Sequence, residues 1–357
     1  MDVHPLFIMQ FKGEEYSIND IDALALRSSQ FPWLSELIHF VKEWISDTAT
    51  IEVKTSGSTM KAKNILLGKE QMKSSALLTA EYFDLKAADS ALLCLPIQYI
   101  AGKMMVVRAA VSGLSLLIAE SKGDPLVDIE ENNLPIDFAA MTPMQIEQIM
   151  KNDLSVRKMR SIKKLIIGGS PLRNEIRLEL LNLNNRIFST YGMTETITHV
   201  AVQEISQENP HEQYKAITGV TFSVDDRGCL VIHTDHLEQE RYVTNDIVEL
   251  FDDRHFKWLG RFDNVINSGG IKINPEKIEQ RIRDIMDLPF YISSKTDHVL
   301  GEKMILVIES TEPIKDTSGL LKDLKKILGK YNTPKEIIFE KQFHYTPTGK
   351  LIRTKFG

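Results

Sequence analysis

The most regular feature of the chain is an alternation of short apolar runs with helix-like segments between residues 91 and 192. Five runs have the length and apolar content of buried strands: ALLCLPI (91–97), LSLLIAE (114–120), IDFAAM (136–141), KKLIIGGS (163–170) and RIFSTYG (186–192). The segments between them that predict helices are GKMMVVRAAVSG (102–113), TPMQIEQIMKN (142–152) and PLRNEIRLELLNL (171–183). This order predicts an α/β fold in which helices flank a mostly parallel sheet.

After residue 197 the apolar runs become shorter and turn signals become frequent. The runs that predict strands here are CLVIHT (229–234), DIVELF (246–251) and HFKWL (255–259). The turn signals DDRG (225–228) and DDRH (252–255) occur beside them. These residues predict a β-rich subdomain.

The C-terminal part of the chain combines strands with two amphipathic helices. The strands are predicted at IKI (271–273) and KMILVIES (303–310), and the helices at PEKIEQRIRDIM (275–286) and GLLKDLKKILGKY (319–331). Asn274 and Pro275 suit the N-cap and the first position of the first helix. We therefore expect a large N-terminal domain, residues 1–262, and a small α+β C-terminal domain, residues 263–357.

The composition is that of a globular protein with a sizeable core, since 43% of the residues are hydrophobic and 26% are charged. A net charge of −6 argues against a nucleic-acid partner. Cys94 and Cys229 are too few for a disulfide framework. The N-terminal stretch MDVHPLFIMQFKGEEY lacks the features of a secretion signal, and no run of about 18 apolar residues occurs. We therefore expect a cytoplasmic protein without a membrane span, of undetermined oligomeric state.

A run of small and hydroxyl-bearing residues follows the alternating positions Ile51 and Val53. It consists of Thr55, Ser56, Gly57, Ser58 and Thr59, and the lysines Lys61 and Lys63 come next. The backbone N–H groups of such a loop can bind an anion, and the lysines add positive charge. The stretch lacks the G-x-x-x-x-G-K-[ST] spacing of P-loop nucleotidases. A phosphate-binding loop and an ordinary polar turn both fit these residues.

Two predicted strands end in residues that could contact a nucleotide, where an open parallel sheet binds its ligands. Gly168 and Gly169 end KKLIIGG, and paired glycines allow a ligand to approach the backbone. In STYGMTET (189–196), a planar base could stack on Tyr191, and the Glu195 carboxylate could bind Mg²⁺. Plain strand-ending turns are the competing interpretation of both segments.

Candidate residues for the ribose and for catalysis occur later in the chain. Asp246 in YVTNDIVEL could bind a ribose diol, and Arg261 in WLGRFDN could reach a ribose or a phosphate. Lys350 follows Gly349 in YTPTGKLIRTKF. A turn aspartate and solvated surface cations are the competing interpretations.

In their order along the chain, these segments resemble the motifs of the AMP-forming acyl-adenylate synthetase superfamily, which includes acyl- and aryl-CoA ligases. The matching motifs are the phosphate loop TSGSTMKAK, the adenine and magnesium motif YGMTE, the ribose motif YVTND, the hinge motif GRFDNVINSGGIKINPEKIE and the lysine motif PTGKLIR. The resemblance extends from residue 55 to residue 353. It implies that ATP, Mg²⁺ and CoA take part in the reaction and that the C-terminal domain is mobile.

The resemblance assigns roles in nucleotide binding to the matching residues. Those that would bind the β- and γ-phosphates are Ser56, Gly57, Ser58, Thr59 and Lys63, and Thr55 is a further ATP-binding candidate. Tyr191 and Gly169 would flank the adenine, and Asp246 and Arg261 would lie near the ribose. Gly168 and Gly192 are further ATP-binding candidates.

The resemblance also implies catalytic and conformational roles. Thr194 would contact the α-phosphate, Glu195 would hold Mg²⁺, and Lys350 would bridge the α-phosphate and the carboxylate of the acid. Asp263 would be the hinge of the C-terminal domain. Gly269 and Gly270 would line the tunnel that admits CoA, where side chains would block a thiol.

The chain departs from the family at several positions. Met60 and Asn245 stand where the family usually has glycine, and Ala62 stands where it usually has proline. Only 54 residues precede the phosphate loop, so much of the usual N-terminal subdomain is expected to be missing. Met60 changes the loop if that position needs a positive φ.

The stretch LPIQYIAGKMMVVRAAVSG (95–113) resembles the family's segment between the phosphate loop and the adenine motif. In the o-succinylbenzoate–CoA ligases of menaquinone synthesis, the helix here carries a basic residue where this chain has Arg108. Because that substrate has two carboxylates, a cation is expected to hold the spare one. The candidate acid-binding residues are Lys103, Arg108 and His199. A helix-surface cation and a packed histidine are the competing interpretations.

The resemblance therefore implies an ATP-dependent, AMP-forming acid–CoA ligase, with o-succinylbenzoate as the leading substrate. Three alternatives stay open: the same chemistry with another aromatic or fatty acid or with a carrier-protein thiol, an ADP-releasing nucleotidase or kinase, and a non-catalytic nucleotide-binding module.

Overall fold

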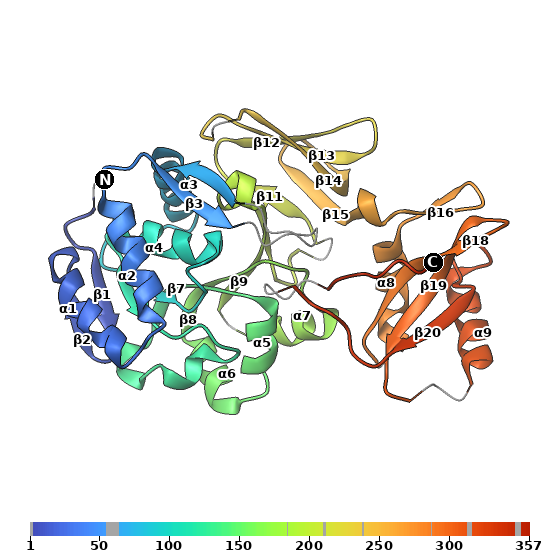
Figure 1. Cartoon of the computed structure of the whole chain (residues 1–357), viewed down its shortest axis with the longest axis horizontal. Helices are drawn as coiled ribbons and strands as arrows, with labels where there is room; N and C mark the ends of the chain where they lie inside the picture. Colours follow the sequence, from blue (N-terminus) through green and yellow to red (C-terminus); the bar gives the residue numbers. More distant parts are fainter. Residues whose placement is uncertain are drawn as a thin grey trace. The chain divides into compact units, whose positions relative to one another are not determined.

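The computed structural model of the chain describes residues 3–54, 64–183, 185–209, 212–237, 239–286, 288–312, 316–346 and 351–357. The chain divides into two compact units. Figure 1 shows the elements, coloured by their position in the sequence. Unit 1 comprises residues 1–221 and 233–240, and unit 2 comprises residues 222–232 and 241–357. The predicted N-terminal domain, residues 1–262, and the predicted mobile C-terminal domain, residues 263–357, are defined by motion about a hinge. This division therefore stays a prediction.

Unit 1 is built on a sheet whose central strands are parallel. In spatial order these strands are β9 (Arg186–Gly192), β8 (Ile162–Ile167), β7 (Ile136–Met141), β5 (Ser90–Leu93) and β6 (Ser115–Ile118). The strand β1 (Ile8–Phe11) continues the sheet parallel to β6, and β2 (Glu14–Tyr16) pairs with β1 at the edge. Beyond β9, the strands β10 (His199–Glu204) and β11 (Tyr214–Ala216) are antiparallel. All five strands expected between residues 91 and 192 are confirmed.

Helices pack against both faces of this sheet (Figure 1). The helices of unit 1 are α1 (Ile21–Leu26), α2 (Leu34–Ile45), α3 (Lys69–Tyr82), α4 (Ile100–Ser112), α5 (Pro143–Ile149), α6 (Asp153–Arg160) and α7 (Asn174–Leu180). On one face, apolar side chains of α5, α6 and α7 form a core with β8, for example Ile146, Met159 and Ile176 with Leu165. On the other face, the Phe83 ring after α3 lies 5.5 Å from the ring of Phe138 on β7. The α/β fold class is therefore confirmed.

A separate hairpin of unit 1 precedes and follows the predicted phosphate loop. Its strands are β3 (Thr50–Lys54) and β4 (Asn64–Gly68), which pair antiparallel. Ile51 and Val53 are buried, as their alternation predicts. The sequence analysis did not predict the strand β4 or the helices α1, α2, α3 and α6.

Unit 2 contains two groups of strands. The first group follows the chain order β12 (Val220–Val224), β13 (Cys229–Thr234), β14 (Arg241–Leu250) and β15 (His255–Arg261). The second is a sheet of β17 (Ile271–Ile273), β16 (Ile266–Ser268), β19 (Gly301–Glu309) and β18 (Phe290–Asp297), with β20 (Glu336–Glu340) parallel to β19. The predicted β-rich segment and the α+β pattern after it are both present.

Two helices cover one face of the second sheet. They are α8 (Pro275–Ile282) and α9 (Thr317–Leu328), and Ile278 and Leu324 pack with Leu306 of β19. The Asn274 side chain accepts a hydrogen bond from the backbone N–H of Lys277 at 3.3 Å, so the expected N-cap is confirmed. No helix in the described ranges is long and apolar enough to cross a membrane.

The final residues of the chain pair with β18. The backbone N–H of Phe356 donates to Ser294 at 3.0 Å. Upstream, the Arg353 guanidinium donates to both carboxylate oxygens of Glu279 on α8, one at 2.8 Å, and to the Ile292 carbonyl at 3.1 Å. Glu279 is buried, so this ion pair ties the C-terminal segment to the core of unit 2.

Replacing Arg353 with alanine is expected to lower the free energy of unfolding of unit 2 by about 3–5 kcal/mol, because the Glu279 carboxylate would stay buried without its cation. Hydrogen exchange of peptides from α8 and β18 measures this change. Lys355→Ala is the matched control, since Lys355 is exposed and lies 3.6 Å from Glu302. Equal protection in the two variants would contradict the importance of the Arg353 pair.

Candidate functional site

The predicted adenine-binding residues of unit 1 come together at the carboxyl ends of β8 and β9. These strands are parallel, with Ile167 next to Ser189. Gly168 and Gly169 follow β8 directly, and the backbone N–H of Gly168 donates to the Met141 carbonyl at 3.1 Å. A Cβ on Gly168 would lie 2.4 Å from the hydroxyl of Thr190, one residue before Tyr191.

The Tyr191 ring is half-buried at the end of β9. It contacts the ring of Tyr214 edge to face, with 6.0 Å between the ring centroids. Gly192 follows in close contact with the returning chain, because a Cβ there would lie 2.4 Å from the Thr198 carbonyl oxygen. Any larger residue would therefore displace the turn between β9 and β10.

That turn holds Thr194 and Glu195. The buried Thr196 hydroxyl accepts from the backbone N–H of Met193 at 3.1 Å and lies 3.0 Å from its carbonyl, which stabilises the short helix 194–196. The Thr194 side chain is buried, and Glu195 is exposed. An exposed carboxylate at a strand end suits Mg²⁺ that is also bound by substrate phosphates.

The backbone at Ile197 is strained. Its φ of 65° and ψ of −50° are rare for a β-branched residue. The N–H of Thr198 donates to the Thr196 carbonyl at 2.6 Å, which closes a γ-turn around Ile197. This reversal directs Thr198 toward helix α4. Strain of this kind is concentrated at functional sites.

Arg108 on α4 is a buried cation, with 3% of its surface exposed. Its Nη2 donates to the Thr198 hydroxyl, and its Nη1 lies 3.5 Å from the sulfur of Met105. Burial lowers the pKa of Arg108 to about 10, so the side chain stays charged at neutral pH. Among the described residues its Nε has no hydrogen-bond partner, and no carboxylate pairs with the guanidinium. Such a cation is available to an anionic ligand.

Lys103 lies on the same helix but has a different environment. Its Nζ lies 4.2 Å from the centre of the Phe40 ring on α2. Burial lowers the pKa of Lys103, and Glu43 and Glu36 oppose this shift. The five-residue separation places Lys103 about 140° around the helix from Arg108. The geometry therefore favours Arg108 as the acid-binding cation.

His199 is buried next to Arg108. Its Nδ1 lies 3.2 Å from the Thr198 hydroxyl, and its Nε2 lies 3.5 Å from the Thr79 hydroxyl on α3. Burial, and secondarily the charge of Arg108, lower the pKa of His199 to about 3. The imidazole is therefore neutral at physiological pH, and both ring nitrogens contact protein hydroxyls.

The low pKa of His199 predicts acid sensitivity. Below pH 6.5 the unfolded chain binds a proton at this residue, whereas the folded chain does so only near pH 3. The free energy of unfolding should therefore fall by about 1.4 kcal/mol per pH unit as the pH drops from 6.5 toward 3. Denaturation of the parent and His199→Gln at pH 6.5 and 5.0 measures this slope. We expect the parent to lose about 2 kcal/mol more than the variant, and equal losses would contradict it.

In unit 2, Asp246 and Arg261 are neighbours on paired strands. The Asp246 carboxylate accepts from the Trp258 indole N–H at 3.0 Å and lies 3.9 Å from an Arg261 nitrogen. Arg261 donates to Asp263 at 2.8 Å. The structure thus brings the predicted ribose residues and the predicted hinge residue into one polar cluster.

Asn245, which replaces the glycine of the ribose motif, joins this cluster. Its amide nitrogen donates to Asp263 at 3.1 Å, and its amide oxygen accepts from Arg227 at 2.9 Å. Arg227 also lies 5.1 Å from the centre of the Phe262 ring. The side chain at position 245 therefore adds contacts to Asp263 that a glycine could not make.

Gly269 and Gly270 form the two-residue loop of the hairpin β16–β17. Their φ angles are 59° and 82°, and Ser268 pairs with Ile271 across the loop. Positive φ at both central residues is the requirement of a type I′ turn, which glycine meets without strain. The turn geometry therefore explains why both positions are glycine. Their role in a CoA tunnel stays a prediction.

Several predicted residues lie outside the described ranges. They are Thr55, Ser56, Gly57, Ser58, Thr59 and Lys63 of the phosphate loop, together with Met60 and Ala62, and Lys350. In the part of the chain that the structure does describe, no group of three His, Cys, Asp or Glu side chains could hold a metal ion. The role of Glu195 as a ligand of Mg²⁺ stays a prediction.

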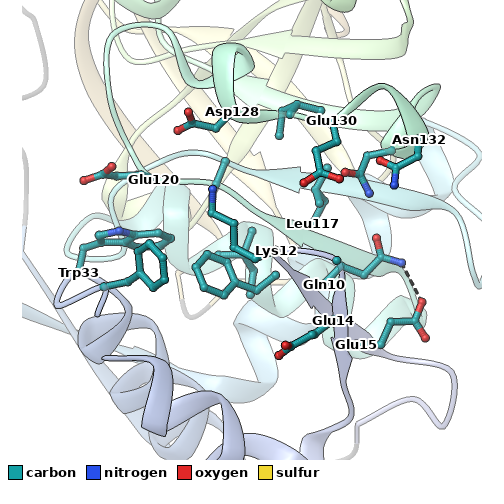
Figure 2. A pocket seen from close by; sticks show the side chains of 17 residues that line it. Gln10, Lys12, Glu14, Glu15, Trp33, Leu117, Glu120, Asp128, Glu130 and Asn132 are labelled. Carbon is teal, nitrogen blue, oxygen red and sulfur yellow. Dashed lines mark hydrogen bonds between the residues drawn. The ribbon is translucent and has the colours of Figure 1, made fainter. Parts of the chain in front are cut away.

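A cavity of about 290 Å³ lies at the carboxyl ends of β1 and β6, away from the residues above. Its lining includes Lys12, Trp33, Glu120 and Asp128, which Figure 2 shows around the opening. Asp128 pairs with Lys122, so part of its negative charge is already compensated. None of the predicted site residues lines this cavity.

Sequence reasoning missed several side chains that contact the site residues, among them Thr79, Thr198, Arg227 and Trp258. Thr198 meets Arg108, which is 90 residues away in the sequence, only in the folded protein. Arg227 had been recognised only as part of a turn signal. No local pattern marks these residues, because their partners are distant in sequence.

The chain is similar to known proteins in sequence and in fold. The family of AMP-binding enzymes matches residues 41–234. A 2-succinylbenzoate–CoA ligase of Staphylococcus epidermidis is 25% identical over 286 residues, 73% of this chain and 59% of that protein. The 2-succinylbenzoate–CoA ligase of Enterococcus faecalis is 24% identical over 340 residues, 85% of this chain and 68% of that protein. The chain thus spans 59% to 68% of the length of these curated relatives.

Two solved structures extend the comparison. An acyl-CoA synthetase (AMP-forming)/AMP-acid ligase II-like protein from Dyadobacter fermentans is 34% identical, with a TM-score of 0.62 over 90% of this chain and 92% of that chain. The O-succinylbenzoate coenzyme A synthetase of Bacillus subtilis, in complex with ATP and magnesium, is 18% identical, with a TM-score of 0.71 over 85% of this chain and 68% of that chain. The second similarity concerns the fold alone.

Proposed function

The chain belongs to the family of AMP-binding enzymes, and from this premise we propose that it is an ATP-dependent, AMP-forming acid–CoA ligase. Its substrate would be an aromatic dicarboxylic acid, with o-succinylbenzoate as the leading candidate and menaquinone biosynthesis as the pathway. The soluble substrates ATP, CoA and the acid suit the cytoplasm, and neither a nucleic acid nor a membrane is needed as a partner.

One observation carries the proposal. Arg108 is buried, charged and without a carboxylate partner in the described ranges, and its contact Thr198 lies three residues after Glu195. An uncompensated buried charge lowers stability unless a ligand neutralises it. A cation that contacts the segment after the proposed magnesium residue can therefore hold the spare carboxylate of an acid while the other carboxylate reacts.

The roles proposed for the nucleotide-binding residues follow from the motifs. Gly168, Gly169, Tyr191 and Gly192 suit the adenine, and Asp246 with Arg261 suits the ribose. The phosphate loop would bind the β- and γ-phosphates through Ser56, Gly57, Ser58, Thr59 and Lys63, with Thr55 at its start. Thr194 would contact the α-phosphate, and Mg²⁺ on Glu195 would reduce the negative charge of the phosphates.

The reaction would have two steps. A carboxylate oxygen of the acid attacks the α-phosphorus, the bond between that phosphorus and the bridging oxygen breaks, and pyrophosphate leaves. Lys350 would offset the charge that develops between the two anions. The thiol of CoA then loses its proton to solvent, its thiolate attacks the acyl carbon, and the bond to AMP breaks. Asp263 as hinge and Gly269 and Gly270 beside the thiol would serve this second step.

The proposal is tested with purified protein, ATP, Mg²⁺, CoA and a panel of acids. Release of AMP and pyrophosphate only with an acid present is the expected result, with o-succinylbenzoate giving the highest kcat/KM. Activity with another acid and none with o-succinylbenzoate would overturn the substrate assignment. Transfer of the acyl group to a carrier-protein thiol but not to CoA would overturn the assignment of CoA as the acceptor. Release of ADP would favour a nucleotidase or kinase, and release of neither nucleotide would favour a binding module.

A further inference from the structure

A chain of hydrogen bonds leads from α3 to Arg108 through the interior of unit 1. The Thr79 hydroxyl donates to the Ser75 carbonyl at 3.0 Å and lies 3.5 Å from His199 Nε2. His199 Nδ1 lies 3.2 Å from the Thr198 hydroxyl, which accepts a hydrogen bond from Arg108. Thr79 and His199 are buried, so water does not compete for the hydrogen bond between them.

The number of protons decides the direction of every hydrogen bond. A hydroxyl has one proton, and that of Thr79 is used on the Ser75 carbonyl. Thr79 must therefore accept from His199, which places the imidazole proton on Nε2. Nδ1 of a neutral imidazole is then an acceptor, so the Thr198 hydroxyl donates to it and accepts from Arg108.

A charged imidazole does not fit this arrangement. Both of its nitrogens would donate, so Thr198 would have to accept from His199 and from Arg108 while its own proton lost its partner. Two cations would also share one buried space. The low pKa of His199, caused by burial and by Arg108, agrees with the neutral form.

We propose that Thr79 and His199 are positioning residues that orient the Arg108 guanidinium, through Thr198, for the spare carboxylate of the acid. The inference rests on the proposed function and extends it to substrate selection. One Nη2–H is used by Thr198 and Nη1 lies 3.5 Å from the Met105 sulfur, while Nε has no hydrogen-bond partner among the described residues. Because an anion is recognised best by donors held in a fixed geometry, the hydrogen-bond chain sets how strongly a second carboxylate is selected.

The first test measures the tautomer of His199 and needs no catalysis. In the ¹⁵N-histidine-labelled protein, with the signal assigned by His199→Gln, we expect the neutral Nε2–H form and no titration between pH 8 and 5. Thr79→Val should shift the population toward Nδ1–H, and Thr79→Ser should keep the Nε2–H form. A parent protein with the Nδ1–H form, or one that titrates near pH 6.5, would overturn the inference.

Ser75 provides a matched control for this test. It is buried on the same helix one turn before Thr79, and its hydroxyl has no hydrogen-bond partner among the described residues. Ser75→Ala removes a hydroxyl of similar burial and keeps the backbone carbonyl that accepts from Thr79. The tautomer of His199 should therefore stay unchanged. A tautomer change in Ser75→Ala equal to that in Thr79→Val would mean that repacking of α3 is the cause.

The second test separates selection from turnover. With o-succinylbenzoate, Thr79→Val should raise KM about tenfold, which corresponds to one hydrogen bond, with kcat and the KM for ATP within twofold of the parent. With 4-oxo-4-phenylbutanoate, which lacks the ring carboxylate, KM should not change. Thr79→Ser should restore the parent KM. An equal rise for both acids, or no rise, would overturn the positioning role.

The two tests distinguish this inference from the proposed function. If the parent releases no AMP with either acid, the ligase proposal and the role in substrate selection both fail, and the tautomer still decides whether the hydrogen-bond chain exists. If AMP is released but the two acids respond alike to Thr79→Val, the ligase proposal stands and the inference fails.

Discussion

Replacing Lys350 with alanine should slow adenylation of the acid by about 10²-fold or more, the loss seen when one preorganised donor is removed from a developing oxyanion. The carboxylate and the α-phosphate are both anions, and their approach creates further negative charge on the phosphoryl oxygens. A positioned ammonium group offsets this charge mainly in the transition state, so kcat should fall more than KM rises. Exchange of labelled pyrophosphate into ATP measures the step.

The second half-reaction serves as an internal control for Lys350. Supplied with the preformed acyl-adenylate and CoA, Lys350→Ala should form the thioester at close to the parent rate, since Lys350 is assigned to the first step only. Lys341, an exposed lysine of the same segment, gives a matched variant, and Lys341→Ala should adenylate normally. Parent-rate pyrophosphate exchange by Lys350→Ala would refute the catalytic assignment.

Replacing Arg108 with methionine should have opposite effects on recognition and on stability. Without the cation, kcat/KM for o-succinylbenzoate should fall by about 10²-fold or more, which is within the range for losing one partner of a buried charge pair. For 4-oxo-4-phenylbutanoate it should change little. The ligand-free protein should gain about 1 kcal/mol or more in unfolding free energy, because a buried uncompensated charge is removed and an apolar side chain of similar length remains.

Lys103→Met is the matched control for Arg108. It also removes a buried cation from α4, but one that lies over the Phe40 ring. We expect no selective loss of the dicarboxylic acid in this variant. A selective loss in Lys103→Met and none in Arg108→Met would transfer the acid-binding role to Lys103. Thermal denaturation and steady-state kinetics on the same preparations provide both measurements.

Asn245 departs from the ribose motif of the family, and its side chain makes specific contacts in the fold. In the sequence it is a missing glycine, and in unit 2 its amide joins Arg227 to Asp263. The contact adds to the ion pair between Arg261 and Asp263. If Asp263 is the hinge, this network would have to change when the hinge turns.

The sequence alone determined the central strands and the start of α8, and its motifs indicated the family. The runs at 136–141 and 186–192 are strands because apolar residues there are continuous and are bounded by turn residues, a local signal that burial on both faces of a parallel sheet requires. Asn274 and Pro275 begin α8 because capping is also local. The motif residues Tyr191, Glu195 and Asp246 could be located for the same reason, since each belongs to a contiguous segment.

Only the tertiary structure decided which charged side chains are compensated. Lys103 and Arg108 look alike in the sequence, yet one lies over an aromatic ring and the other is buried without a carboxylate in the described ranges. His199 is a candidate acid-binding residue in the sequence, and only the fold shows that its ring nitrogens lie against Thr79, 120 residues away, and Thr198. Desolvation and hydrogen-bond direction depend on which helices cover which face of the sheet, and no local pattern contains that information.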